Sequence, residues 1–174
     1  AASDVYKRQS LRNFVKIEIT RLILERFGHV DAIAGVATGA IPQGALVADA
    51  LNLPFVYVRS TPKDHGLENL IEGELRPGMK VVVVEDLIST GGSSLKAVEA
   101  IRRDGCEVIG MVAAYTYGFP VAEKAFKDAK VPLVTLTNYE AVMEVALRTG
   151  YIEEEDVETL NEWRKDPAHW ESGK

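Results

Sequence analysis

The chain has 174 residues, of which 47% are hydrophobic and 26% charged, a composition typical of one soluble globular domain. Its net charge of −6 and its single cysteine, Cys106, argue against nucleic-acid or membrane partners and exclude a disulfide framework. The longest uncharged apolar stretch, residues 108–115, is far shorter than the roughly 20 residues that span a bilayer. We therefore expect a cytoplasmic protein.

The first nine residues fit no pattern in the sequence that follows them. They lack the apolar core of a signal peptide. The segment is identified as the in-frame translation of a common sequencing-library adapter, and a genuine disordered tail is the alternative. We therefore expect an artefactual or disordered segment over residues 1–9 and one folded domain over residues 10–174.

The first half of this domain alternates predicted helices and strands. Apolar residues recur at three- and four-residue spacings over residues 10–27, Leu11 and Phe14 among them, and predict an amphipathic helix before Gly28. The elements expected next are a strand over residues 32–36, a helix over 41–51, a strand over 55–58 and a loop or hairpin over 60–77.

The second half opens on the strongest strand signal. Four consecutive valines, residues 81–84, predict a strand covered on both faces. Thr137 with Glu140 predicts a capping box for a helix that ends at Arg148. The other expected elements are a helix over residues 92–103, a strand over 108–115, a helix over 120–129, a strand over 133–136 and a helix over 153–164. This alternation predicts an α/β fold with a central, mostly parallel sheet flanked by helices.

In such a sheet, ligands bind at the carboxyl ends of the strands, and the segment after the valines carries suitable chemistry. Glu85 and Asp86, if both are ionised, accept hydrogen bonds from sugar hydroxyls or from a hydrated cation. The glycine-rich turn and helix start that follow favour an anion. The residues expected to form this anion site are Ser89, Thr90, Gly91, Gly92, Ser93 and Ser94. The whole segment predicts a ribose 5-phosphate site, with an ordinary strand-to-helix turn as the alternative.

A basic segment forms a second candidate site. Arg59, Lys63 and His65 lie within seven residues of one another in an otherwise acidic chain. Three such groups favour a polyanion, and a pyrophosphate has suitable charge. A solvated basic turn is the alternative.

Three segments together resemble one family. Residues 81–93 resemble the motif with which type I phosphoribosyltransferases bind 5-phosphoribosyl pyrophosphate (PRPP). Residues 59–66 resemble the mobile catalytic loop of the orotate members, and residues 35–44 resemble their loop after the first core strand. The resemblance extends from about residue 10 to residue 170.

The resemblance implies transfer of the 5-phosphoribosyl group from PRPP to orotate, giving orotidine 5′-monophosphate and pyrophosphate in pyrimidine biosynthesis. It implies catalytic roles for Arg59, Lys63, His65 and Asp86. It implies Mg²⁺ bound mainly through PRPP, with Glu85 and Asp86 as candidate ligands through water. Substrate-binding roles are implied for Thr38, Gly39, Arg59, Lys63, His65, Glu85, Asp86, Leu87, Ile88, Ser89, Thr90, Gly91, Gly92 and Ser93. A homodimer that shares loop 60–72 between subunits is implied as well.

Two departures from the family concern positions near the site. Ser60 stands where many orotate enzymes have a second cation, and residues 116–119 contain no arginine of the kind that contacts orotate in some members. The family's N-terminal helix and hood, which supply Phe and Lys contacts to the base, have no counterpart here. We therefore expect the hood to be missing and the orotate half of the site to be incomplete.

Two alternatives in function stay open. Adenine and xanthine phosphoribosyltransferases share the motif of residues 85–94, although the basic segment favours orotate. Some transcriptional regulators keep this fold and bind PRPP without catalysis. Those regulators need a DNA-binding module and a basic face, and the sequence indicates neither.

Overall fold

The computed structural model describes residues 8–59, 70–167 and 169–170. It divides into two compact units, Ala1–Thr137 and Asn138–Lys174. Within the described part of the chain, every helix is too short or too polar to cross a membrane. The expectation of one domain over residues 10–174 stays a prediction.

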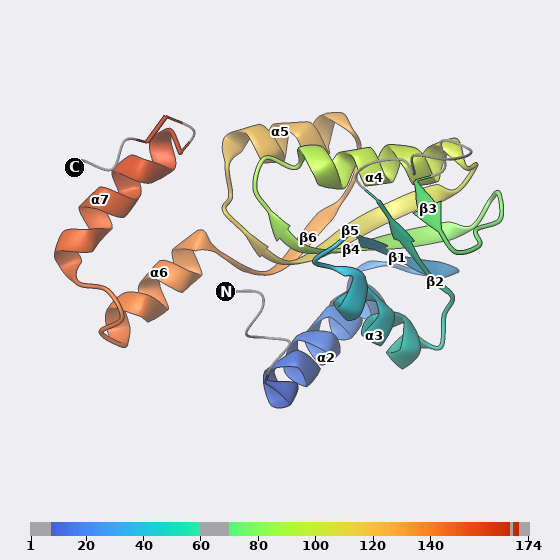
Figure 1. The fold of residues 1–174 in the computed structure, drawn as a ribbon, viewed down its shortest axis with the longest axis horizontal. Coiled ribbons are helices and arrows are strands. Elements are labelled where there is room, and N and C mark those ends of the chain that lie inside the picture. Colours follow the sequence, from blue (N-terminus) through green and yellow to red (C-terminus); the bar gives the residue numbers. More distant parts are fainter. Residues whose placement is uncertain (1–7, 60–69, 168, 171–174) are drawn as a thin grey trace. The chain divides into compact units, whose positions relative to one another are not determined.

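The first unit contains a six-stranded sheet with the strand order β3-β2-β1-β4-β5-β6 (Figure 1). Its strands are β1 (Ala32–Val36), β2 (Phe55–Val58), β3 (Ile71–Glu72), β4 (Lys80–Ile88), β5 (Glu107–Thr116) and β6 (Leu133–Asn138). β1 pairs in parallel with β2 and β4, β4 pairs in parallel with β5, and β3 is antiparallel to β2. The expected mostly parallel sheet is confirmed.

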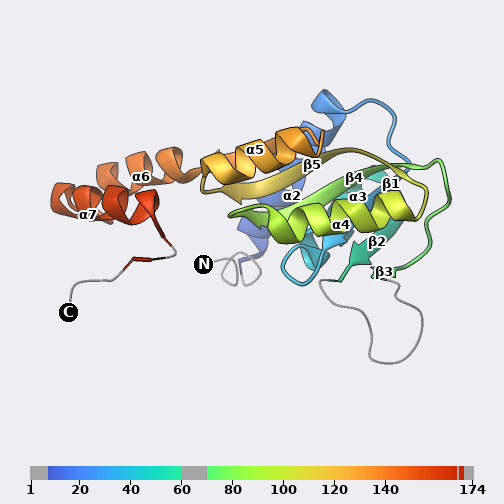
Figure 2. The same ribbon diagram turned by 90° about the horizontal axis from the view of Figure 1, so that it is seen from above.

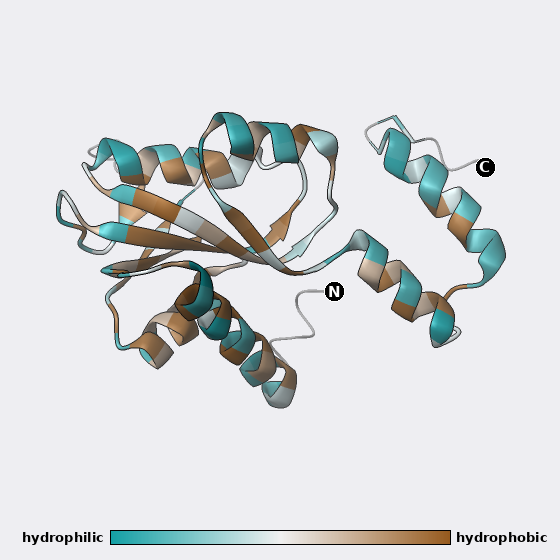
Figure 3. Cartoon of the chain, turned by 180° about the vertical axis from the view of Figure 1, so that it is seen from behind, coloured by the Kyte–Doolittle hydropathy of each residue, from teal (hydrophilic) through white to brown (hydrophobic). Residues whose placement is uncertain are grey.

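Four helices cover the two faces of this sheet. They are α2 (Gln9–Arg26), α3 (Ile41–Leu51), α4 (Gly92–Arg103) and α5 (Pro120–Asp128). α4 and α5 lie on one face and α2 and α3 on the other, as Figures 1 and 2 show. The apolar strands lie between these layers, whereas polar residues gather on the outer sides of the helices (Figure 3).

The valine run explains why the sheet is covered on both faces. Successive side chains of a strand point to opposite faces. Val81 and Val83 accordingly belong to the apolar core that contains residues of α4 and α5, and Val82 and Val84 to the core that contains residues of α2 and α3. The side chains of all four are fully buried, which confirms the prediction from the sequence.

The order of the strands determines where a ligand can bind. β1 and β4 are neighbours in the middle of the sheet, but the chain leaves β1 through α3 toward β2 and leaves β4 through α4 toward β5. The two connections therefore diverge at the carboxyl ends of β1 and β4. Such a topological switch point is where open α/β sheets bind ligands.

The buried face of α2 differs from the predicted one. Ile19, Leu22 and Ile23 are buried, but Leu11 and Phe14 are 44% and 60% exposed. Each residue turns an α-helix by about 100°, so Phe14 lies about 140° from Ile19 around the helix. The spacing gave the right element but included residues that point away from the sheet.

Two predicted boundaries are also wrong. β4 continues to Ile88, two residues beyond the acidic pair, Glu85 and Asp86, that was expected to end the strand. The predicted capping box of Thr137 and Glu140 does not form, because β6 continues to Asn138. Asn138 is the N-cap instead, and its side-chain oxygen accepts a hydrogen bond from the amide of Ala141 at 2.9 Å.

The second unit is a pair of helices, α6 (Tyr139–Arg148) and α7 (Glu154–Lys165). Tyr139 connects them, because its hydroxyl donates to the carbonyl of Leu160 at 3.3 Å and its ring lies 4.7 Å below the guanidinium of Arg164. Arg164 also pairs with Glu140. A few polar and aromatic contacts thus join α6 to α7.

Candidate active site

Glu85 lies inside the strand–helix corner formed by β4 and α4. Its residue is only 5% exposed, and its Oε2 accepts a 2.8 Å hydrogen bond from the hydroxyl of Ser94. Its Oε1 accepts a 3.0 Å hydrogen bond from the amide of Asp86. Burial, together with the neighbouring Asp86 carboxyl, raises the pKa of Glu85 to about 8. The sequence led us to expect two ionised carboxylates side by side, whereas the raised pKa favours the protonated form of Glu85.

Asp86 is half-buried, and its carboxylate reaches the turn after β1. A Cβ atom added to Gly39 would lie 1.9 Å from Oδ2 of Asp86, far inside any van der Waals contact. Only a glycine at position 39 allows this approach. Gly39 thus lies beside Asp86, and the preceding residue, Thr38, has a cis peptide bond with Ala37.

The turn between β4 and α4 has the backbone geometry of an anion site. Gly91 adopts a left-handed conformation with φ of 81°, and its carbonyl accepts the first helical hydrogen bond, from the amide of Leu95 at 2.9 Å. The amides of the first helical turn have no acceptor within the helix and point toward its N-terminal end. The residues that surround this end are exposed, namely Ser89, Thr90, Gly92 and Ser93.

Leu87 and Ile88 differ in position from the other predicted substrate-binding residues of this segment. Ile88 is fully buried in the apolar core, and its carbonyl accepts a hydrogen bond from the amide of Tyr117 at 3.1 Å. Leu87 is 40% exposed on the strand. Any contact of Ile88 with a ligand therefore has to use its remaining backbone atoms.

Arg59 follows β2 at the base of the hairpin that leads to β3. Its amide donates to the carbonyl of Leu70 at 2.8 Å, and its guanidinium pairs with Glu72 at 3.5 Å. Sequence reasoning missed Glu72, because the two-residue strand β3 has no periodic pattern of its own. Lys63 and His65 lie outside the described residues.

Metal binding by the protein alone has little support in these residues. Within the described ranges, no three His, Cys, Asp or Glu side chains form a group that could hold a metal ion. A hydrated Mg²⁺ needs only one or two carboxylates when substrate phosphates supply other oxygens. The half-buried carboxylate of Asp86 suits that arrangement.

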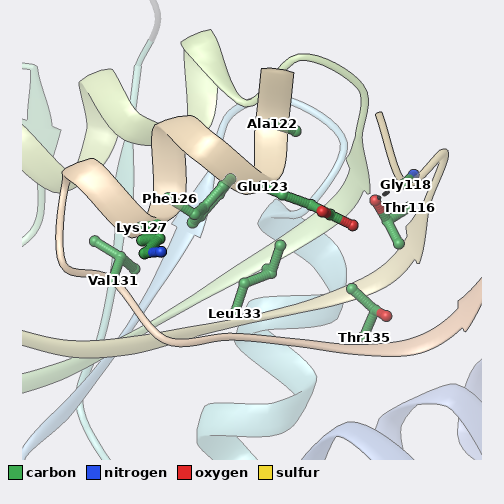
Figure 4. A pocket seen from close by; sticks show the side chains of 9 residues that line it. All are labelled: Thr116, Gly118, Ala122, Glu123, Phe126, Lys127, Val131, Leu133 and Thr135. Atoms are coloured by element: carbon green, nitrogen blue, oxygen red, sulfur yellow. Dashed lines mark hydrogen bonds between the residues drawn. The ribbon is translucent and has the colours of Figure 1, made fainter. Parts of the chain in front are cut away.

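A pocket of about 370 Å³ lies elsewhere, under α5 (Figure 4). Phe126 and Leu133 contribute to its apolar lining, and Lys127 lies near Val131. Phe126 also borders the anion turn, since a Cβ on Gly91 would lie 2.8 Å from its ring. Neither the acidic pair nor the glycine turn lines this pocket, so it is separate from the candidate site.

The sequence matches a known domain and several curated relatives. Residues 10–148 match the model of the phosphoribosyl transferase domain. The chain is 94% identical over 165 residues to the orotate phosphoribosyltransferase of Bacteroides fragilis, covering 95% of this chain and 78% of the relative. It is 71% identical over 160 residues to the enzyme of that name from Porphyromonas gingivalis, covering 92% of this chain and 76% of the relative.

A solved structure has the same fold. The orotate phosphoribosyltransferase from Aeropyrum pernix is 28% identical, with a TM-score of 0.74 over 86% of this chain and 81% of its own. In this chain, the acidic pair of Glu85 and Asp86 and the glycine turn before α4 lie at the topological switch point of that fold. The chain belongs to the phosphoribosyltransferase family and, within it, to the orotate phosphoribosyltransferases.

Proposed function

We infer that this chain transfers the 5-phosphoribosyl group from PRPP to orotate, releasing pyrophosphate and forming orotidine 5′-monophosphate in pyrimidine biosynthesis. The names of the relatives that are 94% and 71% identical support the substrates. The observation that carries the proposal is the close approach of Asp86 to Gly39 at the switch point. This contact brings the acidic pair on β4, next to the β4–α4 turn, against the backbone of the turn after β1.

The ribose 5-phosphate part of PRPP would occupy the β4–α4 turn. Its phosphate would accept hydrogen bonds from the amides and hydroxyls of the run from Ser89 to Ser93, because free amides at a helix start favour an anion. Asp86 would accept hydrogen bonds from the ribose hydroxyls. Glu85, whose Oε1 accepts a hydrogen bond from the amide of Asp86, would contribute to the same ribose site.

The pyrophosphate would contact the basic segment and the turn after β1. We assign it to Arg59, Lys63 and His65, with the backbone of Thr38 and Gly39. The anomeric carbon gains positive charge as its bond to pyrophosphate breaks and as the orotate nitrogen attacks it. Cations that hold the leaving pyrophosphate stabilise this transition state, and closure of the loop would exclude water that otherwise hydrolyses PRPP.

We propose Mg²⁺ as the cofactor. When bound, it would neutralise the oxygens of PRPP and aid departure of the pyrophosphate. Asp86 would hold it, directly or through water, while the substrate supplies most of the ligands.

We also propose a homodimer that shares loop 60–72 between subunits, and a cytoplasmic location. The dimer is carried over from the family, and sedimentation equilibrium of the chain tests it. The buried free thiol of Cys106 suits a reducing compartment.

The test of function is the loss of orotate ultraviolet absorbance on mixing the protein with PRPP and Mg²⁺. Adenine and xanthine are run in parallel. We expect consumption of orotate alone, and its loss with EDTA or in Lys63→Ala. Consumption of adenine or xanthine would assign the chain to another base.

Absence of turnover with any base would contradict transfer by this chain. Calorimetry with PRPP then distinguishes a binder from a protein of another function. A chain that binds PRPP without turnover would match the non-catalytic alternative.

A further inference from the structure

Ser94 differs from its neighbours in the first turn of α4. Ser93 is exposed, whereas Ser94 is 1% exposed. Its hydroxyl does not face the exposed end of the helix, where a phosphate would bind, but donates to Glu85 at 2.8 Å. The two residues are nine positions apart and belong to different elements, so their hydrogen bond joins α4 to β4.

Glu85 in turn is held at both carboxyl oxygens. Oε2 accepts from Ser94, and Oε1 accepts from the amide of Asp86 at 3.0 Å. These two bonds fix the Glu85 side chain in the corner and tie it to the backbone from which the next side chain, Asp86, projects. Asp86 points to the opposite side of the strand, because side chains alternate, and reaches Gly39.

We propose that Ser94 is a positioning residue, which acts through Glu85 to set the position of Asp86 relative to the phosphate-binding turn. This role rests on the proposed PRPP site. A ribose 5-phosphate must contact the turn with its phosphate and Asp86 with its hydroxyls at the same time. The Ser94–Glu85 bond connects the elements that carry these two contacts.

The proposal predicts different effects on two ligands. Inorganic phosphate needs only the turn, whereas ribose 5-phosphate needs the turn and Asp86 together. In Ser94→Ala the backbone amides of the first helical turn remain. We therefore expect the affinity for ribose 5-phosphate to fall about tenfold, the effect of losing one hydrogen bond to a carboxyl group. The affinity for inorganic phosphate should stay within about twofold.

Calorimetry and phosphorus NMR titration of the full chain measure these affinities. Ser94→Thr retains the hydroxyl and should recover most of the affinity for ribose 5-phosphate. Lys96→Ala, an exposed substitution on the same helix, serves as the control and should bind both ligands as the original chain does. Thermal melts of each variant confirm that it is folded.

A double-mutant cycle tests whether Ser94 acts through Glu85. In a Glu85→Ala background, Ser94→Ala should cause no further loss of affinity, because the bond between them is already absent. If Ser94→Ala alone does not fold, the substitution can still be tested in this background. Glu85→Ala removes the buried carboxyl that would otherwise lack a donor.

Three results would overturn the role. Equal losses for both ligands would make Ser94 a direct phosphate ligand, and unchanged affinity for both would make the bond irrelevant to binding. Additive losses in the cycle would exclude action through Glu85. If the original chain itself binds neither PRPP nor ribose 5-phosphate, the proposed function fails, and the positioning role with it.

Discussion

Two glycine turns at the carboxyl edge of the sheet use glycine for different reasons. In the turn after β1, Gly39 is required by its surroundings, because the Asp86 carboxylate occupies the space of a Cβ. In the turn after β4, Gly91 is required first by its own backbone, with φ of 81°. The ring of Phe126 adds a second constraint there, 2.8 Å from the position of a Cβ.

The difference predicts at which of the two glycines a substitution would mainly lower stability and at which it would mainly lower binding. The neighbour of Gly39 is the end of a polar side chain that can rotate away. The neighbour of Gly91 is a ring that is 3% exposed in the core and cannot move without leaving a void. A substitution at Gly39 should therefore impair the site, and one at Gly91 should impair the fold.

Gly91→Ala should give the largest effect. We expect a loss of about 3 kcal/mol in the free energy of unfolding, from left-handed strain and overpacking against Phe126. Urea denaturation measures it. Gly78→Ala is the matched control, because Gly78 has φ of 88° but no atom within 4 Å of its Cβ position. It should lose only about 1 kcal/mol, and equal losses would remove the role of Phe126.

Gly39→Ala should give the second largest effect, on binding. The added methyl group displaces the Asp86 carboxylate, so we expect about a 30-fold loss of affinity for ribose 5-phosphate in calorimetry. The free energy of unfolding should change by less than about 1 kcal/mol. Gly28→Ala, where a Cβ meets nothing within 4 Å, should bind normally. A folded Gly39→Ala that also binds normally would contradict the proposed ribose contact.

Glu85, on the strand before the β4–α4 turn, should make the free energy of unfolding depend on pH. Its pKa is raised from 4.5 to about 8 in the folded state, so between these values the folded chain binds more protons than the unfolded chain. The free energy of unfolding should therefore fall as pH rises through this window, by up to about 1.4 kcal/mol per pH unit. Denaturation at several pH values measures this slope. Glu85→Gln should flatten it, and an unchanged slope would contradict the burial of the proton.

Glu72→Gln, in the short edge strand β3, should give the smallest effect. The 3.5 Å pair with Arg59 joins side chains that are 28% and 27% exposed. Such pairs contribute less than about 1 kcal/mol, and salt weakens them. Urea denaturation at low salt and at about 1 M salt should show a small loss that disappears with salt. A larger, salt-independent loss would indicate a buried network.

Local patterns in the sequence determined the fold class and the site's location. Alternating helix and strand periods predict an α/β sheet, and four valines in a row predict a strand with two buried faces. The acidic pair and the glycine turn were also visible, because strand, turn and helix start are adjacent in the chain. These properties depend on neighbours in the sequence.

Tertiary structure alone decided which groups meet at the site. Asp86 touches Gly39, Phe126 touches Gly91, and Glu85 bonds to Ser94 and takes a raised pKa. Strand order and the opposite crossovers of α3 and α4 bring residues distant in sequence together, and burial raises the pKa of the Glu85 carboxyl. The sequence therefore located the site, whereas the packing of β4 against α4 and against the turn after β1 determines which contacts each of its residues makes.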